Sequence, residues 1–416
     1  MLRRDFLTSL SLALFATSTR LHAAGEPARP PRLLLRSSWQ TYNIGDIAHT
    51  PGLLALIEKH LPGVELWLYP KSVDRGVSEL LLARFPKLRI ITPAEETVAY
   101  AACDFFLHGS GPSLVGQHEM IRWHETTGKP LGIYGVTFAE HKVSEKLRAT
   151  LDAASFFYLR DGVSLAVARS LNLKTPVIEW APDGAFACDL HADEKAAAFL
   201  KANALEDGKF LCCIARLRYT PYWLTDKKGA KFDEQKHARN EAMKENDHVP
   251  LREAITAVAR ETDHKILLCP EDSTQMAVAR EMLLEKLPDD VRKRVVWREH
   301  YWLTDEAVST YVRSSGLFGH EMHSPIMCIG HGIPAIVCRW VEQTSKGTMW
   351  RDIGLGDWLF DLDKKSEHPK LTPAVLSLIR DPAAARVKAA AAREIVVRRQ
   401  RETMTSLRAP LGLPPA

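Results

Sequence analysis

The chain has 416 residues, of which 46% are hydrophobic and 25% are charged, and its formal net charge is +4 at pH 7. This composition is typical of a globular protein and excludes a chain that is disordered throughout, while the length predicts two domains. Because the net charge is small and no basic stripe occurs, we expect no nucleic-acid partner.

The first 24 residues carry the pattern of a twin-arginine export signal. Arg3 and Arg4 precede a short apolar run at residues 10–16, and small residues at the end of the segment offer a cleavage point. The apolar run is too short for a membrane span, so we expect no stable span after signal removal. The mature chain is expected in the periplasm or at the cell surface.

Short apolar runs alternate with amphipathic, helix-length segments over residues 32–187. The predicted strands are residues 32–35, 64–69, 88–91, 104–107, 131–134, 156–159 and 176–179. The predicted helices include residues 53–60, 77–85, 114–125 and 163–171. This alternation predicts a parallel sheet with helices on both faces, that is, an N-terminal Rossmann-like domain.

The pattern restarts over residues 209–375. The predicted strands of this second Rossmann-like domain are residues 210–214, 265–269, 295–297, 316–318 and 335–337. A long polar stretch at residues 216–249 is expected to cover a cleft or to fold partly as a helix. Residues 376–416 form a C-terminal helix and tail, in which residues 382–407 are one helix packing across the domains. The predicted fold class is α/β with two doubly wound domains.

The seven cysteines show no paired spacing, and most lie in apolar runs. A thiol in such a run behaves as a small buried hydrophobic group. We therefore predict neither a disulfide framework nor a metal site built on cysteine.

Ligands of open α/β sheets bind beyond the carboxyl ends of the strands, so residues that follow predicted strands are the first candidates. Asn43, Gly45 and Asp46 follow the first strand as a glycine-containing turn, and a ligand loop and a plain turn are equally open interpretations. After residues 104–107 comes a glycine-rich loop whose backbone N–H groups can approach a phosphate or carboxylate. Its candidate residues are His108, Gly109, Ser110, Gly111 and Ser113, of which Ser113 can cap the next helix.

Charged residues follow two further strands of the first half. Arg160 stands at a strand end, where a guanidinium can bind a carboxylate or phosphate, and an internal ion pair is the alternative. Asp161 is placed to cap the helix that follows. Asp183 ends the last strand of the N-terminal half and faces the linker.

Residues 319–337 combine polar side chains with a helix start. His320, Glu321 and His323 follow an apolar run, and Ser324 is placed to cap the helix. A helix N-terminus attracts anions because its N–H groups are unpaired and its dipole is positive there. The spacing departs from the HExxH zinc pattern, in which a second histidine would stand where this chain has proline. We expect an anion site and no metal.

Six segments resemble, in this order, the polysaccharide pyruvyl transferase family: NIGDIAHTPGLLALI, HGSGPSLVG, KPLGIYGVTF, FFYLRDGVSLAVARSL, APDGAF and HEMHSPIMCIGHGIPAIV. The resemblance covers nearly all of residues 32–365. It implies two Rossmann-like domains facing a cleft, as in glycosyltransferases of the B type. It also implies transfer of an enolpyruvyl-derived group from phosphoenolpyruvate to a sugar, usually as a ketal.

The resemblance also implies roles for individual residues. Asn43, Gly45 and Asp46 match the first glycine–aspartate loop, residues 109–113 match the glycine-rich segment, and Arg160 with Asp161 matches the arginine–aspartate pair. His323 matches the family histidine near the donor. Lys346 matches a lysine beyond the following strand, and Glu321 stands where the family commonly has arginine.

Together these features predict an exported pyruvyl transferase-like protein that acts on a glycan or polysaccharide of the cell envelope. His323 is the expected acid–base residue, and Lys346 and Arg160 are expected to bind the anionic donor. Phosphoenolpyruvate is the expected donor substrate, with no cofactor. The alternatives are a non-catalytic glycan-binding protein, with aromatic residues near 219–223, Trp340 and Trp350 stacking on sugars, and a nucleotide-sugar glycosyltransferase.

Overall fold

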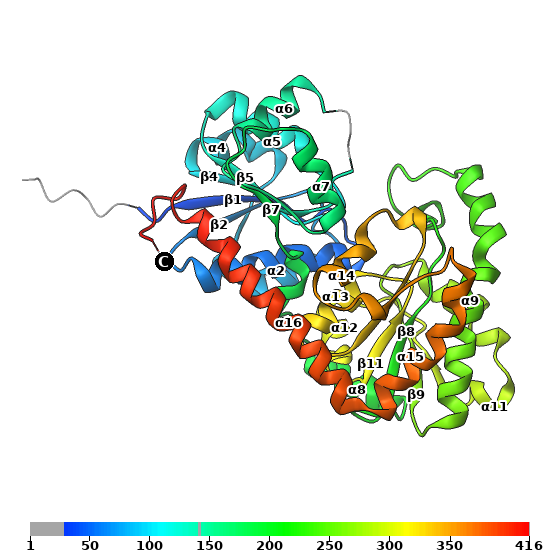
Figure 1. The fold of residues 1–416 in the computed structure, drawn as a ribbon. Coiled ribbons are helices and arrows are strands. Elements are labelled where there is room, and N and C mark those ends of the chain that lie inside the picture. Colours follow the sequence, from blue (N-terminus) through cyan, green and yellow to red (C-terminus); the bar gives the residue numbers. More distant parts are fainter. Residues whose placement is uncertain (1–28, 140–142, 416) are drawn as a thin grey trace, which may run out of the picture.

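The computed structural model describes residues 29–139 and 143–415. It contains two α/β domains, each built on a parallel sheet with helices on both faces (Figure 1). The predicted class of two doubly wound domains is confirmed. The predicted export signal, residues 1–24, lies outside the described residues.

The N-terminal sheet has seven parallel strands in the order β3-β2-β1-β4-β5-β6-β7. Each strand overlaps one of the predicted apolar runs. The strands are β1 (Arg32–Ser37), β2 (Glu65–Pro70), β3 (Arg89–Ile90), β4 (Phe105–His108), β5 (Leu131–Val136), β6 (Phe157–Leu159) and β7 (Ile178–Trp180). Its helices are α2 (Ile44–His60), α3 (Val77–Arg84), α4 (Glu96–Ala102), α5 (Gln117–Thr127), α6 (Glu145–Asp152) and α7 (Gly162–Ser170).

The C-terminal sheet has six parallel strands in the order β10-β9-β8-β11-β12-β13. The strands are β8 (Phe210–Ile214), β9 (Lys265–Leu268), β10 (Val295–Trp297), β11 (Gly316–Gly319), β12 (Ala335–Arg339) and β13 (Leu359–Asp361). Five of them overlap predicted runs. The edge strand β13 was missed because only two apolar residues, Leu359 and Phe360, mark it in the sequence.

The remaining helices accompany the second sheet, and the last of them returns to the first domain (Figure 1). They are α8 (Asp193–Ala202), α9 (Glu234–Glu261), α10 (Gln275–Met282), α11 (Asp289–Arg292), α12 (Thr304–Tyr311), α13 (His323–Gly330), α14 (Met349–Asp352), α15 (His368–Arg380) and α16 (Pro382–Met404). Short 3-10 turns are η1 (Pro93–Glu95), η2 (Gly184–Ala187), η3 (Tyr222–Leu224), η4 (Leu284–Lys286), η5 (Val341–Gln343), η6 (Lys346–Thr348), η7 (Gly356–Trp358), η8 (Lys365–Glu367) and η9 (Thr405–Leu407). Among the described helices, none is both long and apolar enough to cross a bilayer.

Helix α2 begins nine residues before the predicted helix start at residue 53. The side chain of Asn43 accepts hydrogen bonds from the N–H groups of Gly45 (2.7 Å) and Asp46 (3.1 Å), so it caps the helix. Pro51, two residues before the predicted start, therefore lies inside α2. The turn expected at Asn43, Gly45 and Asp46 is the helix N-terminus itself.

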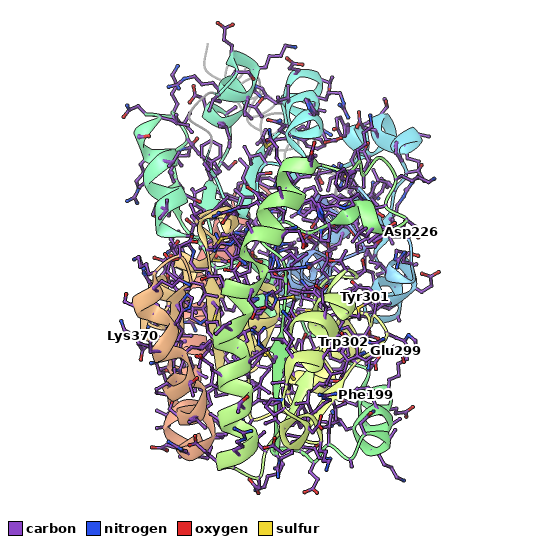
Figure 2. All side chains as sticks on the ribbon, turned by 90° about the vertical axis from the view of Figure 1, so that its right-hand side faces the viewer. Phe199, Asp226, Glu299, Tyr301, Trp302 and Lys370 are labelled. Carbon is purple, nitrogen blue, oxygen red and sulfur yellow. The ribbon has the colours of Figure 1, made fainter. Side chains whose placement is uncertain are left out.

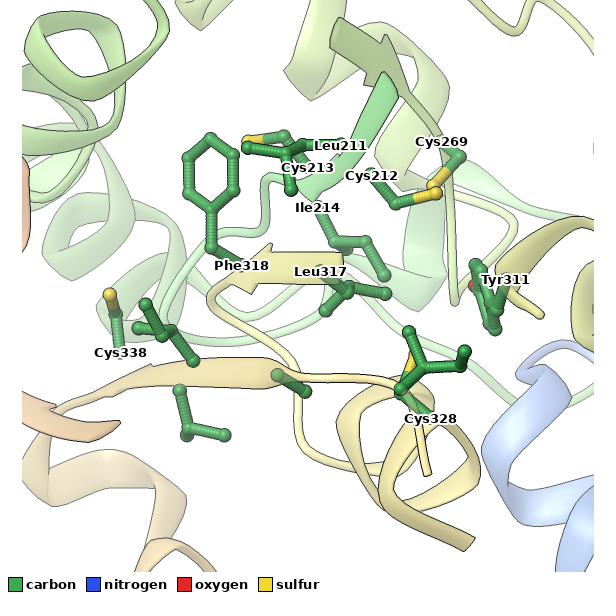
Figure 3. Close-up of a cluster of buried hydrophobic side chains, with 14 of the residues drawn as sticks. Leu211, Cys212, Cys213, Ile214, Cys269, Tyr311, Leu317, Phe318, Cys328 and Cys338 are labelled. Atoms are coloured by element: carbon green, nitrogen blue, oxygen red, sulfur yellow. The ribbon is translucent and has the colours of Figure 1, made fainter. Parts of the chain in front are cut away.

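The core of the C-terminal domain is formed by the central strands and the helices against them. Figure 3 shows Cys212, Cys269 and Cys328 among apolar side chains such as Leu317 and Phe318. All seven cysteines of the chain are buried free thiols. The prediction that they serve as small buried hydrophobic groups is confirmed.

Two segments tie the domains together. Helix α16 runs from the second domain along the first (Figure 1), where Thr403 bonds the Tyr134 hydroxyl at 2.9 Å and Ser406 in η9 bonds that of Tyr158 at 2.6 Å. The polar stretch after β8 reaches the first domain, because Asp226 (Figure 2) pairs with Arg75 at 3.2 Å. Residues 234–249 of that stretch fold into the first part of α9.

Candidate active site

The two sheets meet at their carboxyl ends. The backbone N–H of Ile44, after β1, donates to the carbonyl oxygen of Glu271, after β9, at 2.8 Å. The N–H of Ser273 donates to the carbonyl oxygen of Tyr42 at 2.9 Å, and α2 packs on α13. In both sheets the strand order reverses near this contact, between β1 and β4 and between β8 and β11. Ligands of such folds bind at these reversal points.

His323 opens α13 and lies in the centre of this contact. Its Nδ1 is 3.2 Å from Oε1 of Glu271, while Oε2 of the same carboxylate accepts the backbone N–H of Ser324 at 2.6 Å. Glu271 therefore caps α13, and the prediction that Ser324 caps it is wrong because Ser324 lies within the first turn. The Nε2 atom of His323 is buried and has no hydrogen-bond partner within the described part of the chain.

A second histidine, His49 of α2, meets His323 edge-on, with ring centroids 4.8 Å apart. Its Nδ1 lies 2.8 Å from Oδ1 of Asp183, whose other oxygen accepts Nη1 of Arg160 at 2.7 Å. The Arg160 Nε in turn donates to Thr137 at 2.7 Å. The His49, Asp183 and Arg160 side chains are fully buried. Arg160 thus forms the internal ion pair that the sequence left as the alternative to direct anion binding.

Asp46 and Lys346 add opposite charges to the same centre. Burial alone would raise the pKa of Asp46, but the nearby His323, His49 and Lys346 outweigh it and lower that pKa. The pKa of Lys346 is lowered first by burial and then by Arg160. Burial, followed by His49 and Lys346, lowers the pKa of His323 to about 3, so its imidazole is neutral near pH 7.

Glu321 is held inside the fold. Its carboxylate accepts Nη1 of Arg216 at 3.0 Å and Nε2 of Gln275 at 2.6 Å, and the residue is 4% exposed. Burial raises the pKa of Glu321 to about 7, against the opposing effect of Arg216. Arg216 therefore places a cation beside the position where the family commonly has arginine.

The glycine-rich loop after β4 is packed by its own neighbours. His108 is fully buried, with Nδ1 2.8 Å from the Gly109 carbonyl oxygen and Nε2 accepting the Gly116 N–H at 3.0 Å. The Gly109 N–H donates to the Arg36 carbonyl oxygen at 2.9 Å. This loop therefore stabilises the start of α5 through the bond between His108 and Gly116.

Other residues of this loop are equally engaged. The Ser110 hydroxyl accepts the Gly184 N–H at 2.8 Å, and a Cβ on Gly111 would lie 2.6 Å from Nε1 of Trp39. The prediction that Ser113 caps the next helix is wrong, because α5 begins at Gln117 without a side-chain cap. The sequence alone did not reveal these local partners.

Two further candidates stabilise secondary structure. His320 is fully buried, and its Nε2 lies 3.1 Å from the carbonyl oxygen of Asp247, away from His323. Asp161 caps α7, as predicted, by accepting the N–H and the hydroxyl of Ser164, each at 2.8 Å.

The aromatic candidates divide into two groups. Trp340 and Trp350 are fully buried in the second core and present no face to a sugar. Tyr222 and Trp223 instead line a pocket of about 280 Å³ together with four lysines, Lys227, Lys228, Lys231 and Lys236. The Tyr222 hydroxyl accepts Nε2 of Gln40 at 3.0 Å, and Gln40 also bonds Asp46, which links this pocket to the centre.

Sequence reasoning missed His49, Arg216 and Glu271. Arg216 and Glu271 lie directly beyond β8 and β9, so the rule on strand ends could have found them. His49 lies inside a helix whose start was placed too late. No comparable signal pointed to it.

Gly45 is required by the contact between α2 and α13. A Cβ at this position would lie 2.2 Å from Cβ of His323. We expect Gly45→Ala to lower the free energy of unfolding by about 1–3 kcal/mol and to displace His323. Urea unfolding and donor turnover measure the two effects, with Gly356→Ala as control because its Cβ would meet only Arg351 at 3.5 Å. Equal stability of both variants would contradict the prediction.

The fold is shared with sugar-nucleotide enzymes. MnaA of S. aureus, in a co-structure with UDP, is 13% identical with a TM-score of 0.58 over 92% of this chain and 98% of its own. UDP-GlcNAc 2-epimerase from Methanocaldococcus jannaschii is 12% identical with a TM-score of 0.57 over 88% and 98%. HepE of Anabaena, in complex with UDP and glucose, is 11% identical with a TM-score of 0.53 over 91% and 100%. These likenesses show the glycosyltransferase-B-like fold.

The family comparison covers both halves of the site. No curated protein matches the chain. The family model of polysaccharide pyruvyl transferase matches residues 43–341, from the cap of α2 to just beyond β12. This range includes Asp46, Arg160 and His323 and spans most of the chain. The chain therefore belongs to the polysaccharide pyruvyl transferase family.

Proposed function

We propose that the chain is an exported transferase that moves a pyruvyl-type group from phosphoenolpyruvate to a glycan of the cell envelope. Family membership supports the glycan acceptor and the transferase class. The twin-arginine pattern of residues 1–24 supports export. The observation that carries the proposal is the buried, unpartnered Nε2 of His323 among the charges of Asp46 and Lys346.

The chemistry of this centre suits an anionic donor. Phosphoenolpyruvate carries a phosphate and a carboxylate, which need cations and N–H donors. Lys346 has no ion-pair partner within 4.0 Å in the described part of the chain. The charge of Arg216 contributes to the lowered pKa of Lys346, so a second cation lies near this centre. A bound anion would raise the pKa of His323 and allow it to donate a proton at Nε2.

A nucleotide-sugar glycosyltransferase is the second candidate. It is favoured by the fold, because MnaA and HepE, which share it, were solved with UDP. A glycan-binding protein without turnover is the remaining alternative, supported by Tyr222 and Trp223 in the lysine-lined pocket.

The proposal is tested by incubating the purified mature protein with phosphoenolpyruvate and fragments of cell-envelope glycans. We expect phosphate release that requires both substrates, and a pyruvyl ketal on the glycan seen by NMR. Glycan binding without phosphate release, or consumption of a UDP-sugar instead, would replace the proposal by one of the alternatives. A reporter fused to residues 1–30 tests export, and retention in the cytoplasm would contradict that part.

A further inference from the structure

His49 is a second histidine at the centre of the site, and the family resemblance assigns it no role. It is fully buried, yet its Nε2 has no hydrogen-bond partner within the described residues. The nearest charged oxygen to this atom is Oδ1 of Asp46, at 3.9 Å. A buried polar atom without a hydrogen-bond partner destabilises the folded protein, so packing alone does not account for this histidine.

Asp183 determines which ring nitrogen of His49 carries a hydrogen. Burial would raise the pKa of Asp183, but His49 and Arg160 hold it well below its ordinary value, so the group is a carboxylate. A carboxylate only accepts hydrogen bonds, and therefore the Nδ1 of His49 carries the hydrogen across the 2.8 Å contact. In the neutral form of the imidazole the lone pair is then on Nε2. This is the arrangement of a histidine general base oriented by an aspartate.

His323, on the other side of the contact, is arranged in the same way, with one ring nitrogen next to a carboxylate and the other without a partner. Its Nδ1 faces the Glu271 carboxylate at 3.2 Å, and its Nε2 is also free. The two rings come from different domains, and their planes are 86° apart. The centre thus holds two separate imidazole nitrogens that can exchange protons with a substrate.

Forming a ketal from an enolpyruvyl donor requires three proton transfers, two of them in the first stage. In the first stage an acceptor hydroxyl oxygen bonds to C2 of the donor, its proton passes to a base, and an acid adds a proton to C3. In the second stage the C2–O bond to phosphate breaks, a second hydroxyl oxygen bonds to C2, and that hydroxyl's proton leaves with the phosphate or with solvent. A base for the hydroxyl and an acid for C3 act in the same stage, so one histidine cannot serve as both at once.

We propose that His49, oriented by Asp183, is a second catalytic residue that takes the proton of the acceptor hydroxyl at Nε2, while His323 supplies the proton to C3. This assignment rests on the proposed function. It makes each domain contribute one proton-transfer group, so turnover requires the contact between α2 and α13. Arg160 acts as a positioning residue, because it holds Asp183 and touches neither imidazole.

The protonation state of His49 can be tested without turnover. Long-range ¹H–¹⁵N NMR of the histidine rings in the full-length mature protein, with His49→Gln for assignment, should show hydrogen on Nδ1 and a bare Nε2 near pH 7. A hydrogen on Nε2 of His49 would overturn the assignment, whatever the activity of the protein.

The role of His49 in the reaction is tested with His49→Gln. We expect kcat to fall by about 100-fold or more, with the KM for phosphoenolpyruvate and the melting temperature little changed. In His49→Ala, added imidazoles should restore turnover in proportion to their basicity, which a purely structural role would not produce. His118→Gln, at an exposed position of α5, is the matched control and should match the wild type.

The outcomes separate the two proposals. A wild-type protein that turns over and a His49→Gln variant with kcat within threefold of it would reject His49 alone. A wild-type protein that releases no phosphate with any glycan would reject the proposed function and the role of His49 together.

Discussion

Replacing His323 by glutamine should strongly reduce pyruvyl transfer while the protein stays folded. Glutamine keeps a polar group near Glu271 but supplies no imidazole, so we expect turnover to fall by about 10²–10⁴-fold, the usual contribution of a general acid or base. Alanine is the poorer choice, because it would leave Oε1 of Glu271 without its partner at 3.2 Å and open a cavity at a 3% exposed position.

The measurement is phosphate release with donor and acceptor present, together with the midpoint of thermal unfolding. His237→Gln, at an exposed position of α9, serves as the control and should retain full turnover. Turnover of His323→Gln within threefold of the wild type would remove His323 from the mechanism.

A protonation measurement separates the chemical role of His323 from a structural one. Burial lowers the pKa of His323 to about 3, from an ordinary histidine value near 6.5. The ring is therefore neutral at pH 6. Phosphoenolpyruvate should raise this pKa and make binding take up a proton from solution. Calorimetry in buffers of different ionisation enthalpy detects that uptake, and the His323→Gln variant should lose it.

The fold was predictable because its strands are nearly continuous apolar runs, as expected of parallel sheets covered on both sides. The error at α2 has a physical cause: Asn43 starts this helix and Pro51 lies inside it, whereas prolines more often mark helix starts. The burial of α2 between the two domains stabilises this helix even though it contains an internal proline. Local sequence signals do not carry that information.

The site was predictable only in part, and the difference lies in long-range partners. Asp183 and His323 were recognised because they follow strands, and the sheet order brings those ends together. The loop at His108 carries the same local signal, but its groups are used by Gly116 and by Arg36. Sequence spacing cannot show which polar groups find partners inside the protein. Only the folded chain distinguishes a free imidazole from a bonded one.

Replacing Arg160 by methionine should destabilise the protein strongly. The guanidinium and Asp183 form a fully buried pair at 2.7 Å, and the variant would leave Asp183 with His49 as its remaining side-chain hydrogen-bond partner. Breaking a buried pair from one side costs about 3–5 kcal/mol, because an uncompensated charge stays inside. Urea unfolding near pH 7 measures the effect.

Two comparisons separate this structural role from anion binding. The double variant Arg160→Met with Asp183→Asn removes both charges, so it should recover part of the lost stability. Arg260→Met breaks an exposed pair with Asp290 and should leave the unfolding midpoint unchanged. The opposite result would be an Arg160→Met variant that keeps wild-type stability but no longer binds phosphoenolpyruvate in calorimetry. In that case the guanidinium would bind the donor, as the family resemblance implies, rather than position Asp183 and His49.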